Sequence, residues 1–206
     1  MSRKASRSVV VFDLGGVLIE WDPRNLYRKL FPGDEAGMER FLREVCTQDW
    51  NERQDEGRRF AEAEEELIRL HPDKGPLIRA WHARFDEMIP GAIQGTVAIL
   101  DELNRRSTPL YALTNWSNET FAPQRERFDF LGWFQGILVS GDEGVIKPDP
   151  RIFRLLLDRF GIRAEDAVFI DDNPANARAA SALGIHGIHF QSPEALRREL
   201  GAVGLL

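Results

Sequence analysis

The sequence contains a single cysteine and no long apolar run, and each absence excludes a class of protein. Cys46 alone cannot form an internal disulfide, which excludes a disulfide-stapled fold and fits the reducing cytoplasm. The apolar runs are only a few residues long, whereas a membrane-spanning helix needs about 20 apolar residues. The basic residues 1–8 lead directly into a short apolar run, unlike a secretory signal. We therefore expect a cytoplasmic protein without a membrane segment, in which residues 1–8 form a tail.

An excess of basic residues is also missing. The 206-residue chain has 27 Lys and Arg against 33 Asp and Glu, which gives a net charge of −6. A sequence-independent nucleic-acid binder needs a basic face, and the chain has no Walker segment for nucleotide phosphates. Local charge still permits a small anionic substrate. We therefore expect a small-molecule partner, no nucleic acid, and either a monomer or a homodimer.

The sequence has two parts that differ in their pattern of apolar and charged residues. Residues 22–88 are charged and helical, and their patterns predict helices over 23–31, 34–45, 58–70 and 75–88. The stretch 49–53 interrupts this helical pattern. We interpret this part as a small helical bundle inserted after the first strand.

The other part alternates apolar strands with helices. The predicted strands are 9–13, 110–114, 136–139, 167–171 and 185–189, and the predicted helices are 94–106, 118–127, 150–160, 174–183 and 193–200. This alternation is typical of βαβ units in a parallel sheet. The sequence therefore predicts an α/β fold, a Rossmann-like doubly wound parallel sheet formed by residues 1–20 and 89–206. The helical-bundle cap is predicted over residues 21–88.

Four polar segments lie close behind apolar strands. They are FDLGGV (12–17), LTNWS (113–117), KPDP (147–150) and FIDDN (169–173). In an open α/β sheet, ligands bind outside the carboxyl ends of the strands. An acid, a hydroxyl, an amine and a pair of acids should therefore meet at one rim of the sheet.

These four segments, in this order, resemble the four motifs of the haloacid dehalogenase superfamily. The resemblance extends from residue 9 to about residue 190, and the helical insert occupies the position of that family's cap. FDLGG with IDDN is similar to a phosphatase branch that includes glucose-1-phosphate phosphatases, and LTNWS also occurs in haloalkanoate dehalogenases. The resemblance implies a phosphomonoester hydrolase that works through an aspartyl-phosphate.

Asp13, Thr114 and Lys147 are the predicted catalytic residues. The Asp13 carboxylate would attack phosphorus and so divide one difficult displacement into two easier ones; the alternative is an acid that caps a turn. The Thr114 hydroxyl and the backbone after it, at Asn115, would bind phosphate oxygens, although Thr114 could instead cap the next helix. The Lys147 ammonium would neutralise the nucleophile and the charge that develops at phosphorus, unless it is a solvated surface lysine.

Asp171 and Asp172 indicate a metal site. Adjacent acids after an apolar strand repel each other unless a cation lies between them, and hard oxygen ligands with open positions suit Mg²⁺. The family resemblance implies that Asp13 and the backbone carbonyl of Gly15 also bind this metal, with one of the two late acids bound directly and the other through water. Alternation along the strand end suggests Asp172 as the direct ligand. The alternative is that the pair only caps the next helix.

Gly15 departs from the family pattern, because many of its phosphatases have a general acid there. General acid catalysis contributes about 10²–10⁴-fold, so this chain needs an easier leaving group or another acid. An anomeric sugar phosphate would fit, and Glu20 or Asp22 could substitute for the missing acid.

Two rival functions remain open. A 2-haloalkanoate dehalogenase would use the same Asp13 and needs neither the acid nor Mg²⁺, but Asp171 and Asp172 would repel its carboxylate substrate. An inactive interaction domain with this fold is the second rival, because a fold does not guarantee activity.

The cap should select the substrate. Within the stretch 49–53, Trp50 offers a flat face for a sugar, and Arg53 or Asn51 could bind hydroxyls or an anion. The alternative for Trp50 is packing between cap helices.

Overall fold

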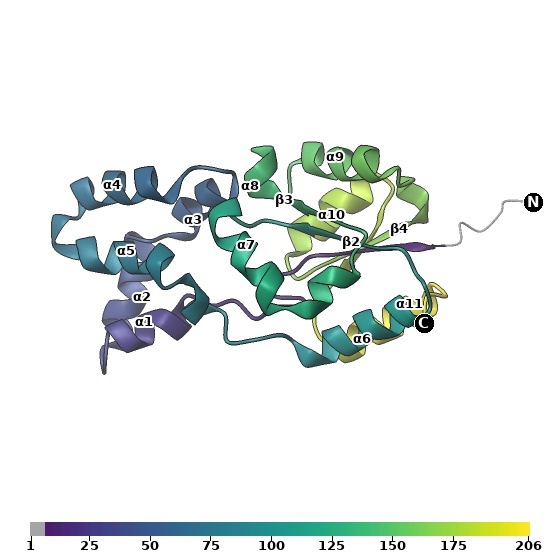
Figure 1. Ribbon diagram of the computed structural model, residues 1–206, viewed down its shortest axis with the longest axis horizontal. Coiled ribbons are helices and arrows are strands. Elements are labelled where there is room, and N and C mark those ends of the chain that lie inside the picture. The colour runs from purple at the N-terminus through teal and green to yellow at the C-terminus, as the bar shows by residue number, and fades with distance from the viewer. Residues whose placement is uncertain (1–6) are drawn as a thin grey trace, which may run out of the picture.

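The computed structural model describes residues 7–206, and a five-stranded parallel β-sheet lies at its centre (Figure 1). The strand order is β3-β2-β1-β4-β5, and every neighbouring pair is parallel. The strands are β1 (Val9–Phe12), β2 (Leu110–Thr114), β3 (Gly136–Val139), β4 (Ala167–Asp171) and β5 (His186–His189). The predicted doubly wound α/β fold is confirmed, with β1 at the point where the strand order reverses. Of the predicted N-terminal tail, residues 1–6 lie outside the described residues.

Alternate residues of the strands face two separate apolar layers. Val11 packs in one layer with Phe153 of α9 (Pro150–Phe160), and α10 (Pro174–Ala182) completes that layer. Val10 and Phe12 pack in the other, with Leu100 of α6 (Gln94–Arg105), together with α7 (Asn118–Arg127) and α11 (Pro193–Ala202). In Figure 1 the two helix layers lie above and below the sheet. Burial on both faces explains why the strands read as continuous apolar runs.

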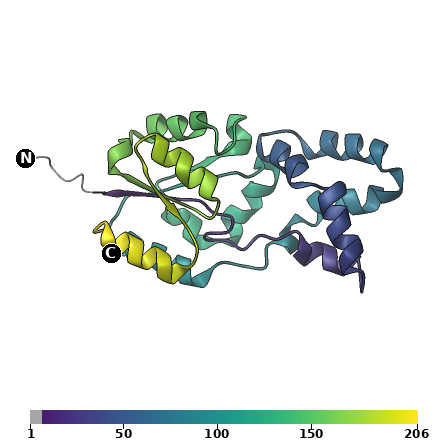
Figure 2. The same cartoon turned by 180° about the vertical axis from the view of Figure 1, so that it is seen from behind.

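The segment between β1 and α6 forms a group of helices beside the carboxyl ends of the strands (Figures 1 and 2). These helices are α1 (Arg24–Leu30), α2 (Glu35–Glu44), α3 (Gln48–Asp55), α4 (Phe60–Leu70) and α5 (Gly75–Ala83), followed by the 3-10 turn Phe85–Met88. Tyr27 and Trp81 lie at the centre of the group, and each is at most 2% exposed. The rings of Phe41 and Trp50 pack against this pair.

Helix α3 corrects one prediction, because the stretch 49–53 is helical. The Thr47 hydroxyl caps this helix by accepting a hydrogen bond of 3.0 Å from the Trp50 N–H. The helix has no apolar stripe, since its buried residues are Trp50, Asn51 and Gln54. Apolar periodicity therefore could not reveal it, whereas the capping threonine could have.

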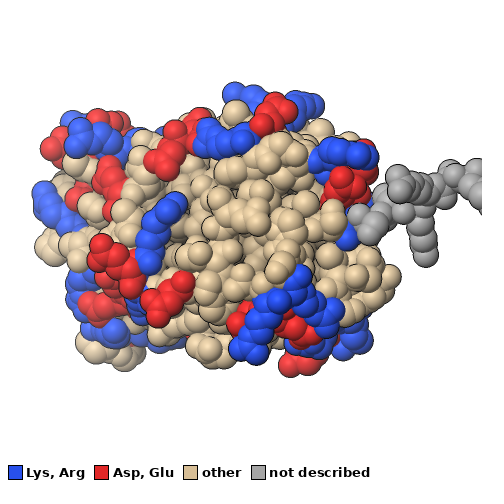
Figure 3. Space-filling view, turned by 45° about the vertical axis from the view of Figure 1, so that its right-hand side comes forward, with Lys and Arg blue, Asp and Glu red and all other residues tan. Residues whose placement is uncertain are grey.

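The surface carries both signs of charge. On the face shown in Figure 3, basic and acidic side chains lie side by side around a largely uncharged middle. Ion pairs such as Arg28–Glu35 and Arg163–Glu165 are more than half exposed, so each contributes little to stability. Across residues 7–206, no helix is long and apolar enough to cross a membrane.

Candidate active site

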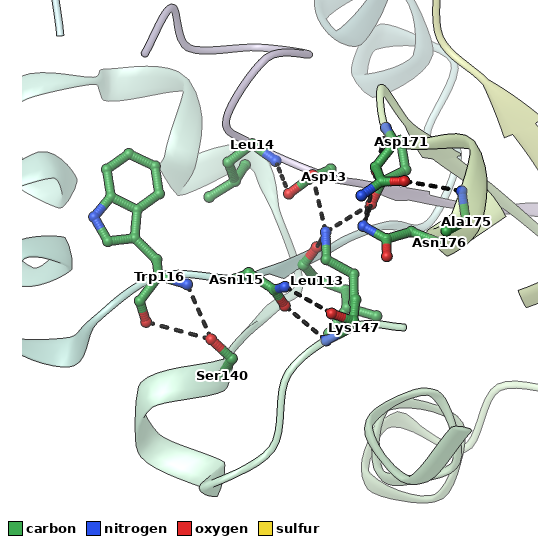
Figure 4. A network of polar contacts seen from close by, with 11 residues as sticks. Asp13, Leu14, Leu113, Asn115, Trp116, Ser140, Lys147, Asp171, Ala175 and Asn176 are labelled. Carbon is green, nitrogen blue, oxygen red and sulfur yellow. Dashed lines mark hydrogen bonds and ion pairs between the residues drawn. The ribbon is translucent and has the colours of Figure 1, made fainter. Parts of the chain in front are cut away.

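Asp13, Lys147 and Asp171 meet at the carboxyl ends of β1 and β4 (Figure 4). Asp13 directly follows β1, and Asp171 is the last residue of β4. The register pairs Phe12 with Ile170, so the residue after each of these lies at the same rim. Lys147 reaches the rim from the loop between the short helix α8 (Ser140–Glu143) and α9. The meeting of strand ends that the sequence predicts is therefore present.

The Lys147 ammonium lies between two carboxylates. Its Nζ is 2.9 Å from Oδ2 of Asp13 and 2.7 Å from Oδ2 of Asp171, and it donates a third bond of 3.0 Å to the carbonyl of Leu113. The lysine side chain is completely buried. Burial alone would lower the pKa of Lys147, but the two carboxylates outweigh it and raise that pKa above its usual value. Lys147 is therefore a fixed cation and not a solvated surface lysine.

Asn115 holds the backbone of Lys147 in place. Its Oδ1 accepts a hydrogen bond of 2.8 Å from the Lys147 N–H, and its Nδ2 donates one of 3.0 Å to the Lys147 carbonyl. This two-point clamp joins the end of β2 to the loop before α9. Both polar atoms of the Asn115 amide are thus used in positioning the lysine, although Asn115 also lines the cavity described below.

The two late acids have different surroundings. Asp171 is fully buried, and Asn176 donates to both of its carboxylate oxygens at 3.0 Å while the Asn173 N–H donates to Oδ1 at 2.8 Å. Asp172 is exposed and lines the cavity. Gly16 has φ +71°, and a Cβ at that position would overlap the Asp172 carboxylate. The absence of a side chain at Gly16 is therefore what allows Asp172 to lie over this turn.

The carboxylates form a group that fits a divalent cation. One oxygen from each of Asp13, Asp171 and Asp172 lies within 4.8 Å of the others. Burial raises the pKa of Asp13 to about 8, with Lys147 opposing this shift and Asp171 adding to it. Burial and the neighbouring Asp171 also raise the pKa of Asp172. Crowded acids that resist ionisation are a donor set that a hard cation such as Mg²⁺ would stabilise.

A cavity of about 320 Å³ opens above this cluster. The residues predicted from the sequence that line it are Asp13, Gly15, Asn51, Asn115, Lys147 and Asp172. Thr114 ends β2, is 1% exposed and does not line the cavity. Glu20 and Asp22 do not line it either, and Asp22 instead accepts a hydrogen bond from the Arg24 N–H at 2.9 Å.

Trp50 and Arg53 lie on another side of α3. Both line a separate cavity with Thr47 and Asp49. The Trp50 ring packs at 5.5 Å from that of Trp81 and is 8% exposed, which is the packing alternative considered for this residue. The structure therefore does not bring Trp50 and Arg53 to the acid cluster.

On the side formed by residues 21–88, Trp21, Phe85 and four polar residues of α3 line the active-site cavity, and the sequence predictions largely missed the four polar residues. Only Asn51 had been considered, as a hydroxyl-binding residue. The four are Gln48, Asn51, Glu52 and Asp55. Their spacing is i, i+3, i+4 and i+7, which places them on one face of a helix. This polar stripe was readable from the sequence once a helix was assumed at 48–55.

Asp55 also joins α3 to the core. The Ser140 hydroxyl donates a hydrogen bond of 2.5 Å to the Asp55 carbonyl and accepts one of 2.9 Å from the Trp116 N–H. A Cβ on Gly57 would lie 2.9 Å from the carbonyl of Gly141, so the two backbones approach closely there. The end of α3 is thus fixed against the rim of the sheet.

Known proteins with similar sequences include phosphatases. A model of the haloacid dehalogenase-like hydrolase family matches residues 8–184. Acyl-CoA dehydrogenase family member 10 of Mus musculus is 28% identical across 96% of this chain and 19% of its own length. Phosphoserine phosphatase of Thermus thermophilus is 37% identical across 48% of this chain and 42% of its own. The chain thus spans less than half the length of these two relatives.

Solved structures share the fold across most of the chain. A haloacid dehalogenase family enzyme of Bacteroides thetaiotaomicron, in complex with magnesium and inorganic phosphate, superposes with a TM-score of 0.68. It is 21% identical and covers 90% of this chain and 94% of that one. L-2-haloacid dehalogenase of Xanthobacter autotrophicus, with chloropropionic acid covalently bound, gives 0.63 at 18% identity across 97% and 84%. At these identities the likeness concerns the fold alone.

Proposed function

The chain belongs to the haloacid dehalogenase-like hydrolase family, and on that premise we propose that it is a Mg²⁺-dependent phosphatase of a small phosphorylated metabolite. The observation that carries this proposal is the contact of Lys147 with both Asp13 and Asp171, beside the exposed carboxylate of Asp172. The proposed nucleophile, a fixed cation and the acids proposed to bind the metal would thereby act at one cavity. The phosphatase named among the relatives supports the same reaction class.

The reaction would begin with an attack of Asp13 on phosphorus. The Leu14 N–H donates to Oδ1 of Asp13 at 2.7 Å and Lys147 holds Oδ2, so the orientation of the carboxylate is set before substrate arrives. Lys147 would offset charge on the transferring phosphoryl group. Water would then hydrolyse the aspartyl-phosphate and release phosphate. We also propose that Thr114 binds a phosphoryl oxygen, for which its hydroxyl, buried at the end of β2 and outside the cavity lining, would have to become accessible to the substrate.

Mg²⁺ would be held by Asp13, Asp172 and the backbone carbonyl of Gly15, and Asp171 would bind it through a water molecule. When bound, it would neutralise the carboxylates and draw charge from the phosphoryl oxygens. Asp171 is better suited to the outer position, because its oxygens already accept hydrogen bonds from Lys147 and Asn176.

The charges of the cavity disfavour the dehalogenase alternative. Its lining includes four carboxylates, and the single lysine already contacts two acids. A 2-haloalkanoate brings a carboxylate of its own, which this lining would repel. A phosphate ester also brings negative charge, but its partner cation would offset that charge.

We further propose that residues 21–88 act as a cap domain that selects the substrate. The side of α3 that lines the cavity offers the amides of Gln48 and Asn51, which suit hydroxyl groups. An anomeric sugar phosphate is the substrate class that matches both these amides and the missing acid at Gly15, because its leaving group is easier to expel than an alkyl alkoxide.

Product release with and without EDTA tests the proposed function. The substrates are p-nitrophenyl phosphate, glucose-1-phosphate and 2-chloropropionate. Phosphate release that EDTA abolishes and Mg²⁺ restores is the expected result. Chloride release that is indifferent to EDTA would overturn the proposal in favour of a dehalogenase.

A further inference from the structure

The active-site cavity lacks a proton donor at the turn after the nucleophile. Gly15 lines the cavity without a side chain, and an alkoxide leaving group needs a proton as its bond to phosphorus breaks. The titratable side chains among the lining residues are Asp13, Glu52, Asp55, Lys147 and Asp172. A proton donor supplied by the lining of this cavity is therefore one of these five side chains.

Three of the five already have other tasks. Asp13 is the proposed nucleophile, and Lys147 is fully buried between two carboxylates. Asp172 belongs to the acid cluster that fits a cation, so its carboxylate would be ionised. Glu52 and Asp55 remain, and both lie on α3, in the wall formed by the cap.

The position of Asp55 is fixed, and its surroundings favour a proton on its carboxyl group. Its backbone is held by Ser140, and the Asn51 amide donates to Oδ2 at 2.9 Å. Burial raises the pKa of Asp55 to about 7; the Ser117 N–H and Lys147 oppose this shift, and Glu52 adds to it. An acid with a pKa near neutral pH can both give and take a proton.

Glu52 has less support from its surroundings. It lies in the middle of α3, and its carboxylate accepts a hydrogen bond of 3.2 Å from Gln48 of the same helix. Within residues 7–206, the Glu52 carboxylate forms no hydrogen bond or ion pair with the core. The core thus holds Asp55 at the rim in a way that it does not hold Glu52.

We propose that Asp55 is the general acid and base of this enzyme, supplied by the cap in place of the acid missing at Gly15. This proposal rests on the proposed phosphatase function. As the Asp13–phosphorus bond forms and the ester P–O bond breaks, the Asp55 proton would pass to the leaving oxygen. The Asp55 carboxylate would then take a proton from the water that attacks phosphorus, which frees Asp13 and restores the starting state.

The test is the dependence of kcat/KM on the leaving group in Asp55→Asn. p-Nitrophenol leaves without protonation, whereas a sugar or alkyl alcohol does not. We expect kcat/KM to fall by about 10²–10⁴-fold for glycerol-2-phosphate, less for glucose-1-phosphate because its anomeric oxygen is easier to expel, and by no more than about threefold for p-nitrophenyl phosphate, the scale of a small change in binding. Asp49→Asn, the same change on the same helix but outside this cavity, should leave both values unchanged.

The second half-reaction gives an independent readout. Without a base for water, Asp55→Asn should accumulate aspartyl-phosphate and show a burst of p-nitrophenol followed by slow turnover. In the wild type, kcat/KM for glycerol-2-phosphate should decline above pH about 7, because Asp55 then loses its proton. That decline should be absent in Asp55→Asn.

Several outcomes would overturn the assignment. Equal losses for all leaving groups would show that Asp55 is structural, and a selective loss in Glu52→Gln instead of Asp55→Asn would make Glu52 the acid. In both cases the wild type still hydrolyses phosphate esters, so the proposed function survives. Absence of wild-type hydrolysis of every phosphate ester would instead refute the proposed function, and the role of Asp55 with it.

Discussion

The two walls of the active-site cavity are built in different ways. On the core wall, Lys147 and Asp171 have their polar atoms bonded to neighbouring side chains and backbone, and both are completely buried. On the cap wall, a short polar helix presents Gln48, Glu52 and Asp55, and the hydrogen bond from Ser140 to the Asp55 backbone holds the end of this helix against the core.

This difference separates the two tasks of the site. The core wall fixes charges to within hydrogen-bonding distance, as covalent chemistry at phosphorus requires. In our proposal, the cap wall carries both the amides that recognise hydroxyl groups of the substrate and the proton donor. On this proposal, substitutions in α3 would change substrate choice while the chemistry of the core stays the same.

Removal of Lys147 should have the largest effect on both turnover and stability. Lys147→Ala leaves Asp13 and Asp171 buried without their shared cation, which should abolish turnover and lower the free energy of unfolding by about 3–5 kcal/mol. Urea denaturation and phosphate release measure the two effects.

The matched control for this change is Lys29→Ala. Lys29 pairs with Glu87 at 2.8 Å, but its side chain is 56% exposed, so we expect a change of at most about 1 kcal/mol. A Lys147→Ala protein as stable as this control would contradict the account of a buried charge network.

An aspartate at position 15 should protonate the leaving group in place of Asp55, so that turnover no longer depends on the cap wall. A Cβ at Gly15 meets no atom within 4 Å, and its φ does not lie in the left-handed region, so an aspartate fits there. Gly15→Asp should restore about 10²-fold or more of the turnover of glycerol-2-phosphate that Asp55→Asn loses. Steady-state kinetics of the double variant measure this rescue, and Gly15→Asn in the same background is the uncharged control.

A side chain at Gly16 should disturb the acid cluster without touching α3. Gly16→Ala forces a left-handed φ on alanine and pushes the Asp172 carboxylate away. We expect the affinity for Mg²⁺ to fall by about 10–100-fold, measured as the Mg²⁺ concentration that gives half-maximal activity. Unchanged Mg²⁺ dependence would argue that Asp172 is not a ligand.

The two sides of α3 should respond differently. Trp50→Ala opens a space against Phe60 and Trp81 and should lower the free energy of unfolding by about 3–5 kcal/mol, with little change in KM at a temperature where it is folded. Gln48→Ala, on the side that lines the cavity, should raise KM for sugar phosphates and leave stability within about 0.5 kcal/mol. The opposite pattern would return Trp50 to the substrate-binding role first predicted for it.

The core was readable from the sequence because its signals are local. Asp13 and Asp171 lie at or just beyond an apolar strand, Lys147 lies in the loop that follows β3 and α8, and strand order in a parallel sheet brings such positions to one rim. Helix α3 escaped because it buries Asn51 and Gln54 where an apolar stripe would be expected. Because no helix was predicted over residues 48–55, the sequence analysis could not tell which of these residues share a helix face. The prediction therefore singled out Trp50 and Arg53 and missed Asp55. Which side of a polar helix faces a cavity depends on tertiary packing, which a single sequence does not contain.

The most direct test of the central claim is to trap a phosphoryl group on Asp13. The wild-type protein would be mixed with p-nitrophenyl phosphate and Mg²⁺, quenched in acid, and reduced with borohydride, which converts an aspartyl-phosphate to homoserine. Mass spectrometry of the peptide should find the conversion at Asp13, and it should be lost after EDTA treatment and in Asp13→Asn. Rapid phosphate release with an unmodified Asp13 at every quench time would contradict the account.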